Sequence, residues 1–231
     1  MRLTVVDHPV VAAKLTALRS VTTDRSTFRR LVDDLVTLLA YEATQAVPVE
    51  PIEVTTPLTT MTGVRLTSPP PLVVPVLRAG VGMLDGLTRL LPDAEVGFAG
   101  LARDERTAEP SWYAERLPDN AAGRSVFVLD PMLATGGTLV AVVDALLARG
   151  AEAVTCVCLL ASPEGVARVE SAFPDDRVSL VVAAVDERLD DRAYIIPGLG
   201  DAGDRLFGSI PHASTPGTDT MDACGIRCSL I

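Results

Sequence analysis

The sequence has very little lysine and histidine: one lysine, Lys14, and two histidines among 231 residues. A lysine-assisted nucleoside triphosphatase needs the loop G-x-x-x-x-G-K-[ST], and no lysine follows Lys14 to complete one. The formal net charge is −10, whereas binding along a nucleic-acid backbone needs clustered lysine and arginine. These shortages exclude that class of enzyme and argue against a nucleic-acid partner. A small anion could still be held by backbone N–H groups and a few arginines.

Cysteine is also scarce, with four in the chain. Cys156 and Cys158 lie two apart in an apolar run, so we expect reduced core thiols on one strand face. Cys224 and Cys228 lie near the C-terminus, and with no C-x-x-C pair a structural zinc site is not expected. The N-terminus lacks the basic-then-apolar order of a signal peptide, and no run reaches membrane-spanning length. We therefore expect a cytoplasmic protein without a membrane partner.

Aromatic residues make up only 4% of the chain, against 48% hydrophobic residues, so the core must be mainly aliphatic. Apolar runs typical of strands buried on both faces occupy Leu72–Leu77, Val96–Leu101, Val126–Leu129, Val154–Leu160 and Val178–Ala184. Helical patterns follow three of these runs, at Gly82–Leu91, Gly137–Arg149 and Pro163–Phe173. This alternation predicts an α/β fold with right-handed βαβ units and a parallel sheet covered by helices on both faces.

Before these runs the chain is expected to be mostly helical. One helix is predicted from Pro9 to Leu18, and a second from a cap at Thr23 or Asp24 to about Thr44. The second carries one apolar stripe, formed by Phe28, Leu31, Leu35, Leu38 and Leu39. Two short strands are expected between Ile52 and Leu66. The proline linker 68–71 is too short to divide domains.

Polar residues stand directly after several apolar runs. They are Arg78, Arg103 and Asp130, and ligands of open α/β sheets gather at the carboxyl ends of strands. The two guanidinium groups suit phosphate oxygens, although each alone could be an ordinary surface charge. The polar segment Asp104–Asn120 is long for a structureless loop and is read as a mobile lid or a hairpin.

The turn Thr135–Thr138 is suited to an anion. It opens a helix whose first N–H groups have no internal partners, and its two glycines let a phosphate reach the main chain. An ordinary glycine-rich turn between strand and helix would have the same residues. Asp130, one step back along the chain, could accept hydrogen bonds from a sugar, or could simply cap the turn.

A second glycine-rich loop spans Pro197–Asp204. Its exposed N–H and C=O groups could read the edge of a flat heterocycle, and Asp201 could hold Mg²⁺ through water. A tight surface loop is the alternative reading of the same residues.

Three long motifs together resemble the uracil phosphoribosyltransferase family, of the bacterial type within the type I phosphoribosyltransferases. They are P-V-L-R-A-G-V-G-M at 75–83, V-L-D-P-M-L-A-T-G-G-T at 128–138 and Y-I-I-P-G-L-G-D-A-G-D at 194–204. D-H-P near the N-terminus, Y-E-A-T at 41–44 and A-S-P-E-G at 161–165 fit as well. The resemblance covers about residues 1–208. It implies one domain with a Rossmann-like parallel sheet, an N-terminal helical segment and a β-hairpin or lid.

The resemblance implies transfer of a phosphoribosyl group from phosphoribosyl pyrophosphate (PRPP) to uracil, giving UMP and pyrophosphate. It also implies Mg²⁺ bound with PRPP rather than by a protein cage, and a homo-oligomer, a dimer or larger. Some bacterial members respond to GTP, so activation by GTP stays open. A related enzyme acting on another base, such as a 6-oxopurine, is the nearest rival. A regulator that binds PRPP without catalysis is a second rival.

Matching positions carry the family's roles onto this chain. The residues expected to bind PRPP are Arg78, Arg103, Asp130, Pro131, Met132, Leu133, Ala134, Thr135, Gly136, Gly137, Thr138 and Asp201. Those expected to bind uracil are Ile195, Gly200, Asp201 and Ala202. Asp130, Arg103 and Asp201 are the expected catalytic residues, with Asp201 also the candidate to reach Mg²⁺. No general base is assigned, because His8 and His212 lie outside the motifs.

Three features depart from a generic phosphoribosyltransferase. Pro131 takes the place of a second acid beside Asp130, which matches the uracil-type motif. Arg188 stands where the family often has glycine. The segment 209–231 extends past the usual end with a composition typical of disorder. Its last residues, C-S-L-I, fit a prenylation pattern that a chance match would also produce.

Overall fold

The computed structural model describes residues 1–103 and 110–209. The strands of the main sheet are β1 (Arg2–Val5), β4 (Leu72–Leu77), β5 (Glu95–Val96), β6 (Phe98–Arg103), β7 (Pro110–Arg116), β8 (Val126–Leu129), β9 (Met132–Leu133), β10 (Val154–Ala161) and β11 (Val178–Val185). Two hairpins lie outside it, formed by β2 (Val49–Thr55) with β3 (Thr60–Leu66) and by β12 (Arg188–Leu189) with β13 (Ile195–Ile196). The helices are α1 (Pro9–Arg19), α2 (Arg25–Ala43), the 3-10 helix η1 (Ala79–Met83), α3 (Leu84–Thr88), α4 (Gly137–Ala148), α5 (Pro163–Ala172) and α6 (Ala202–Phe207).

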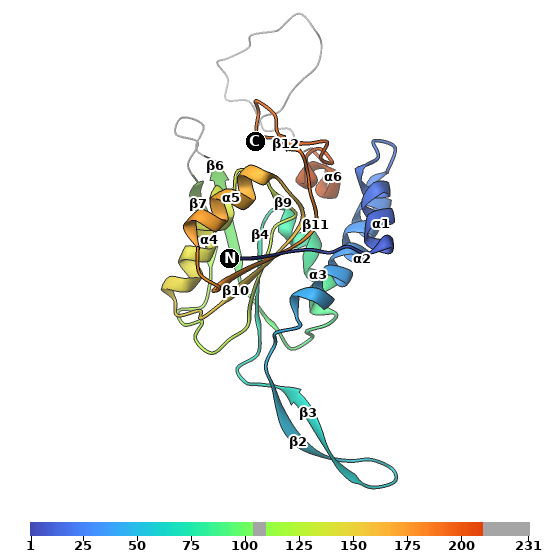
Figure 1. Cartoon of the computed structure of the whole chain (residues 1–231), viewed down its shortest axis with the longest axis vertical. Coiled ribbons are helices and arrows are strands. Elements are labelled where there is room, and N and C mark those ends of the chain that lie inside the picture. Colours follow the sequence, from blue (N-terminus) through green and yellow to red (C-terminus); the bar gives the residue numbers. More distant parts are fainter. Residues whose placement is uncertain (104–109, 210–231) are drawn as a thin grey trace, which may run out of the picture.

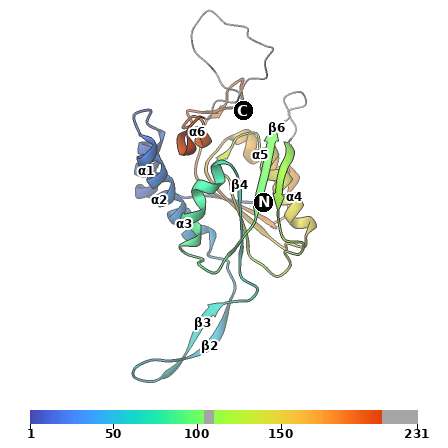
Figure 2. The ribbon, with the colours of Figure 1, turned by 180° about the vertical axis from the view of Figure 1, so that it is seen from behind.

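The main sheet has the strand order β1-β11-β10-β8-β4-β6-β7 and is parallel except for β7. Helices α1, α2, α3 and α6 lie on one side of it, and α4 and α5 on the other (Figures 1 and 2). The predicted α/β fold is therefore confirmed.

Two hydrophobic cores, one on each face, explain the continuous apolar runs. In β4, Val73 packs with the residues of α1 and α2, whereas Leu72 and Val74 pack with those of α4. Cys156 and Cys158 lie in the second core as buried free thiols, as predicted. Because both faces of each central strand are covered, neither face can carry a polar stripe.

Helix α1 begins at Pro9 and helix α2 is capped by Asp24, both as predicted. The Nδ1 atom of His8 accepts a hydrogen bond from the Val10 N–H (3.2 Å), and Asp24 accepts one from the Thr27 N–H (2.9 Å). Most of the predicted α2 stripe is fully covered, including Phe28. The strand β1 was not predicted, since it has only four residues and its partner β11 lies at the far end of the chain.

The predicted helix Gly82–Leu91 is wrong in its bounds. The chain forms a 3-10 turn over 79–83 and a single short helix over 84–88. Glycine has low helix propensity, and three glycines fall in this stretch. Gly86 also lies so close to α2 that a Cβ would come within 2.8 Å of Val36. The close packing of Gly86 against α2 therefore accompanies a short helix α3.

Antiparallel hairpins lie both outside the main sheet and at its edge. Strands β2 and β3 pair over seven residues each and project from the sheet as a long arm (Figure 1). Strand β7 pairs with β6, so this part of the predicted lid is a hairpin. The segment 104–109 between them lies outside the described residues, as do His212, Cys224, Cys228 and the extension from residue 210. In the described ranges, no helix is both long and apolar enough to cross a bilayer.

Candidate active site

The candidate site lies along the carboxyl edge of the parallel sheet. The neighbouring strands β8, β4 and β6 end at Asp130, Arg78 and Arg103 respectively. Arg78 therefore leaves the sheet between the other two. The side chain of Arg103 lies outside the described part of the chain, so only its backbone position is fixed.

The anion turn opens α4 without a side-chain cap. Gly136 stands at the N-cap with φ of 78°, a left-handed conformation that favours glycine, and no side chain bonds the first N–H groups of the helix. Gly136 and Gly137 are buried, while Thr135 and Thr138 are partly exposed. A helix of twelve residues with free terminal N–H groups offers an anion both hydrogen bonds and the positive end of its dipole.

Ser162, which directly follows β10, stabilises the segment that leads into this turn. The Ser162 hydroxyl donates to the Ala134 carbonyl (2.6 Å) and accepts from the Gly165 N–H (2.9 Å), and the Ser162 N–H donates to the Leu133 carbonyl (2.9 Å). Ser162 is fully buried, and it also caps α5. These contacts give the A-S-P-E-G segment a structural reason.

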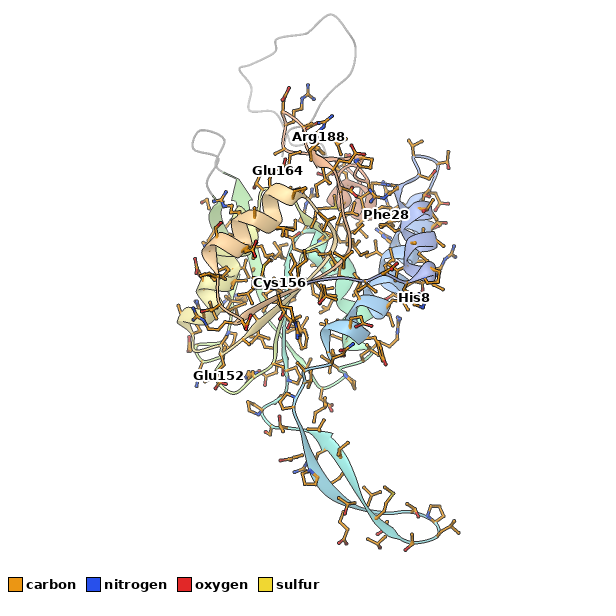
Figure 3. All side chains as sticks on the ribbon, viewed as in Figure 1. His8, Phe28, Glu152, Cys156, Glu164 and Arg188 are labelled. Carbon is orange, nitrogen blue, oxygen red and sulfur yellow. The ribbon has the colours of Figure 1, made fainter. Side chains whose placement is uncertain are left out.

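The carboxylate of Asp130 sits in apolar surroundings. Burial raises its pKa from 3.8 to about 6, opposed only by the hydrogen bond from the Met132 N–H (3.3 Å). Burial also raises the pKa values of the thiols Cys156 and Cys158, and the nearby Asp130 charge adds to the effect. Figure 3 shows Cys156 in the middle of the sheet. The site thus keeps a carboxylate that a neighbouring positive charge would favour in its ionised form.

Arg78 lies beside the second glycine-rich loop. Its guanidinium lies 3.7 Å from the Asp204 carboxylate of α6, and both side chains are substantially exposed. A Cβ at Gly203 would lie 3.2 Å from the Asp201 carboxylate and 3.8 Å from the Arg78 guanidinium. The predicted residues Arg78 and Asp201 are therefore close neighbours.

The second loop runs from β13 into α6. Ile195 and Ala202 are buried, whereas Gly200 is exposed, with no other atoms within 4 Å of a Cβ built there. Asp201 caps α6 by accepting from the Asp204 N–H (2.7 Å). The loop therefore presents open backbone at Gly200 beside a fixed carboxylate.

Four functional neighbours escaped the sequence reading. Arg168 of α5 places its guanidinium 3.4 Å from where a Cβ of Gly137 would stand, at the start of α4. Arg19 and Asp186 form an ion pair against Gly198, and Arg205 bonds the Leu199 carbonyl. Asp186 directly follows β11, so the rule that found Asp130 would also have found it. The arginines gave no local signal, because their partners lie far away in the sequence.

Arg188 and His8 lie apart from the residues of the candidate site. Arg188 is exposed on β12, beside Glu164 (Figure 3). Hydrogen bonds from the N–H groups of Glu164 itself and of Leu189, with the Arg188 charge adding to them, lower the Glu164 pKa. His8 caps α1 on the opposite side of the molecule (Figure 3).

Comparison with known proteins gives consistent matches over most of the chain. The family model described as uracil phosphoribosyltransferase matches residues 5–209. A uracil phosphoribosyltransferase of Kineococcus radiotolerans is 67% identical, covering 91% of this chain and 100% of its own length. One of Beutenbergia cavernae is 64% identical over the same shares. The solved structure of the AQ2163 protein from Aquifex aeolicus is 39% identical, with a TM-score of 0.83, covering 89% of this chain and 98% of that one.

The raised pKa of Asp130 predicts how this residue affects the stability of the fold. A carboxyl whose folded pKa is raised binds more protons in the folded state between pH 3.8 and about 6, so unfolding free energy falls as pH rises through that window. At pH 7.5, Asp130→Asn should raise the unfolding free energy, by at most about 3 kcal/mol. The gain should shrink towards pH 4.

Urea unfolding of wild type and variant at pH 7.5 and 4.5 measures this difference. Asp144→Asn, the same change at an exposed position on α4, is the control and should show little pH-dependent gain. A wild type more stable than Asp130→Asn at pH 7.5 would contradict the prediction.

Proposed function

The chain belongs to the uracil phosphoribosyltransferase family, and we propose that the residues gathered at the carboxyl edge of its sheet carry the family's reaction. That reaction transfers the 5-phosphoribosyl group of PRPP to uracil, giving UMP and pyrophosphate. The observation that supports this assignment of residues is the convergence of three distant segments. Arg78 after β4 lies 3.7 Å from Asp204 at the start of α6, and the neighbouring strand β8 leads through Asp130 to the uncapped start of α4.

In this proposal the turn Asp130–Thr138 holds the ribose and its 5′-phosphate. The free N–H groups of α4 and the hydroxyls of Thr135 and Thr138 bond the phosphate. Arg168 adds the positive charge that the turn itself lacks. A guanidinium at a helix N-terminus is unfavourable by itself, but it becomes favourable once a phosphate lies between the two.

Arg78 and Arg103 would contact the pyrophosphate side of PRPP, together with Asp201. Mg²⁺ would arrive with PRPP and take most of its ligands from phosphate and water. Asp201 uses one oxygen to cap α6 and has capacity for a further bond. Mg²⁺ bound there would neutralise charge on the leaving pyrophosphate.

Uracil would lie against the second glycine-rich loop, contacting Ile195 and the segment Gly200–Ala202. The open backbone at Gly200 can pair with the donors and acceptors on the edge of a flat base, while buried Ile195 supplies apolar contact. The same loop separates this enzyme from relatives acting on 6-oxopurines, since it is the segment that matches the uracil type.

The chemistry would depend on fixed charge rather than on an acid–base residue. Displacement of pyrophosphate develops positive charge on the ribose, and an ionised Asp130 would face it. The positive charge that develops on the ribose would favour the ionised form of Asp130, whose pKa burial raises in the free protein. The β6–β7 hairpin would close over the site and exclude water. No general base is assigned to remove the uracil N1 proton.

The proposal places this activity in residues 1–208, with 209–231 as an extension that turnover does not require. A cytoplasmic location agrees with the free thiols at Cys156 and Cys158. Activation by GTP, which the family resemblance leaves open, is tested by adding GTP to the same assay.

We further propose that the β2–β3 arm joins two copies of the chain. An isolated two-stranded hairpin is marginally stable in water. This one exposes Val49 (53%), Val64 (67%) and Leu66 (43%), which share one face by their pairing. A second copy would cover that apolar face and hold the arm in place.

Turnover with PRPP, Mg²⁺ and each of uracil, cytosine, hypoxanthine and orotate tests the main proposal. Of the four bases, we expect only uracil to give nucleotide and pyrophosphate. In Asp130→Asn the kcat should fall by roughly 100-fold or more, the scale of one lost transition-state contact. No UMP from folded wild type would overturn the assignment of function. Undiminished turnover in Asp130→Asn would remove only Asp130 from the mechanism.

Removing Arg168 should weaken binding of the phosphate end of PRPP. A charge-assisted hydrogen bond contributes about 1.5–3 kcal/mol, so Arg168→Ala should raise the KM for PRPP by about tenfold or more. Arg177→Ala is the matched control, since this arginine precedes β11 at the opposite edge of the sheet and pairs with Asp175. Equal KM values in the two variants would exclude Arg168 from the phosphate site.

Disrupting the arm should change the mass in solution. Val64→Lys should shift the protein towards monomer in light scattering coupled to gel filtration, because a buried lysine would be desolvated. Val21→Lys, which alters a valine that is 96% exposed between α1 and α2, is the control. An unchanged oligomer in Val64→Lys would place the interface elsewhere.

A further inference from the structure

An ion pair between Arg19 and Asp186 bonds the backbone of the loop assigned to uracil. Neither residue belongs to the three long motifs. We propose that Arg19 and Asp186 are a positioning pair that fixes this loop and thereby sets the affinity for the base. The inference rests on the proposed function, because it assumes that the loop binds uracil. It assigns these two residues no contact with the substrate.

The pair holds both polar groups of Gly198. Arg19 donates two hydrogen bonds to Asp186, from Nη1 to Oδ2 (2.7 Å) and from Nη2 to Oδ1 (2.5 Å). Nη1 also donates to the Gly198 carbonyl (2.7 Å), and the Gly198 N–H donates to Oδ2 of Asp186 (2.9 Å). A bidentate arginine–carboxylate pair is directionally rigid. Gly198 is therefore fixed in orientation as well as in position.

Each partner is anchored to a different part of the fold. Asp186 follows β11, its N–H donates to the Ala161 carbonyl of β10 (2.8 Å), and its side chain is only 5% exposed. Arg19 is the last residue of α1, where a positive charge is favoured by the helix dipole. The pair thus fixes the loop relative to both the sheet and the N-terminal helices.

A second arginine holds the next peptide group. Arg205 donates to the Leu199 carbonyl (2.9 Å) and to the Ser20 carbonyl (2.7 Å), and its guanidinium lies 4.3 Å from the ring centre of Phe28. Figure 3 shows Phe28 on α2, beside the helix that carries Arg19. Gly198 and Leu199 are therefore held on their inner side, whereas Gly200 stays open on its outer side.

The effect should fall on uracil more than on PRPP. The phosphate turn has a separate support, since the Ser162 hydroxyl bonds the Ala134 carbonyl and the Gly165 N–H rather than the side chains of Arg19 or Asp186. A buried ion pair adds little net stability, but its geometry specifies one conformation, and losing one partner leaves the other charge unpaired. The pair therefore acts through the part of the loop before Asp201, on the base-binding side. Asp201, which is assigned to both substrates, is fixed by its own bond from the Asp204 N–H (2.7 Å).

Steady-state kinetics of Arg19→Gln, Arg19→Lys and Asp186→Asn test this role, with KM for uracil, KM for PRPP and kcat measured separately. We expect Arg19→Gln to raise the uracil KM by about tenfold or more, the scale of a lost charge-assisted bond. The PRPP KM should change by less than about threefold, within the usual variation of distant substitutions. Arg19→Lys keeps the charge without the fork, so its uracil KM should lie between those of wild type and Arg19→Gln.

Lys14→Gln is the matched control. It removes the only lysine of α1 and its ion pair with Asp34 of α2 (2.6 Å), and this pair does not touch the loop. Its KM values should stay at those of wild type. If Arg19→Gln does not fold, Arg19→Lys and Asp186→Asn carry the test.

Three outcomes would overturn the positioning role: an unchanged uracil KM in the folded variants, an equal rise in both KM values, or a Lys14→Gln variant that behaves like Arg19→Gln. Each of these leaves the proposed function intact as long as wild type makes UMP. A wild type that makes no UMP is the separate failure, that of the function.

Discussion

The pairing of β4 with β8 is the contact on which the rest of the structure depends. The two strands run parallel in register from Leu72 opposite Val126 to Pro75 opposite Leu129. Just beyond that point the two segments approach so closely that a Cβ on Gly80 would lie 2.3 Å from the Leu129 carbonyl. Only glycine fits there without a shift of the backbone. Because these two strands are neighbours, the segments that follow them, with Arg78 and Asp130, leave the same edge of the sheet from adjacent strands.

Much of the fold could be predicted because its signals are local. The start of α1, the cap of α2 and the buried runs of the central strands each depend on residues close together in the sequence, and the structure confirms them. The predictions failed where a distant contact decides. Strand β1 exists because β11 provides a partner, and the short helices over 79–88 yield to close packing against α2. The sequence of β1 does not show that β11 is its partner, and the sequence of 79–88 does not show that it packs against α2.

The same division applies to the candidate site. The anion turn and the loop before α6 were predicted from turn chemistry, and the structure places Arg78 beside the second of them through Asp204. The residues that hold those loops gave no such signal. Arg19 and Ser162 bond backbone groups of other segments, so only the tertiary structure reveals their role. Asp186 differs from them, since its place directly after an apolar run is a local signal.

The turn has a single acid, Asp130, and the burial of its neighbour Pro131 explains why a second one is absent. Pro131 is buried, and its carbonyl accepts hydrogen bonds from the N–H groups of both Leu159 and Leu160 of β10 (3.0 and 3.1 Å). A carboxylate in its place would have to be desolvated, and burial already raises the pKa of the partly exposed Asp130 beside it to about 6. Two such charges without a permanent cation would destabilise the fold further. The fold thus favours one carboxylate here. In the proposed mechanism the pyrophosphate side then depends on Asp201 and the arginines. Asp201 and Arg78 are exposed, so their charges cost less to maintain.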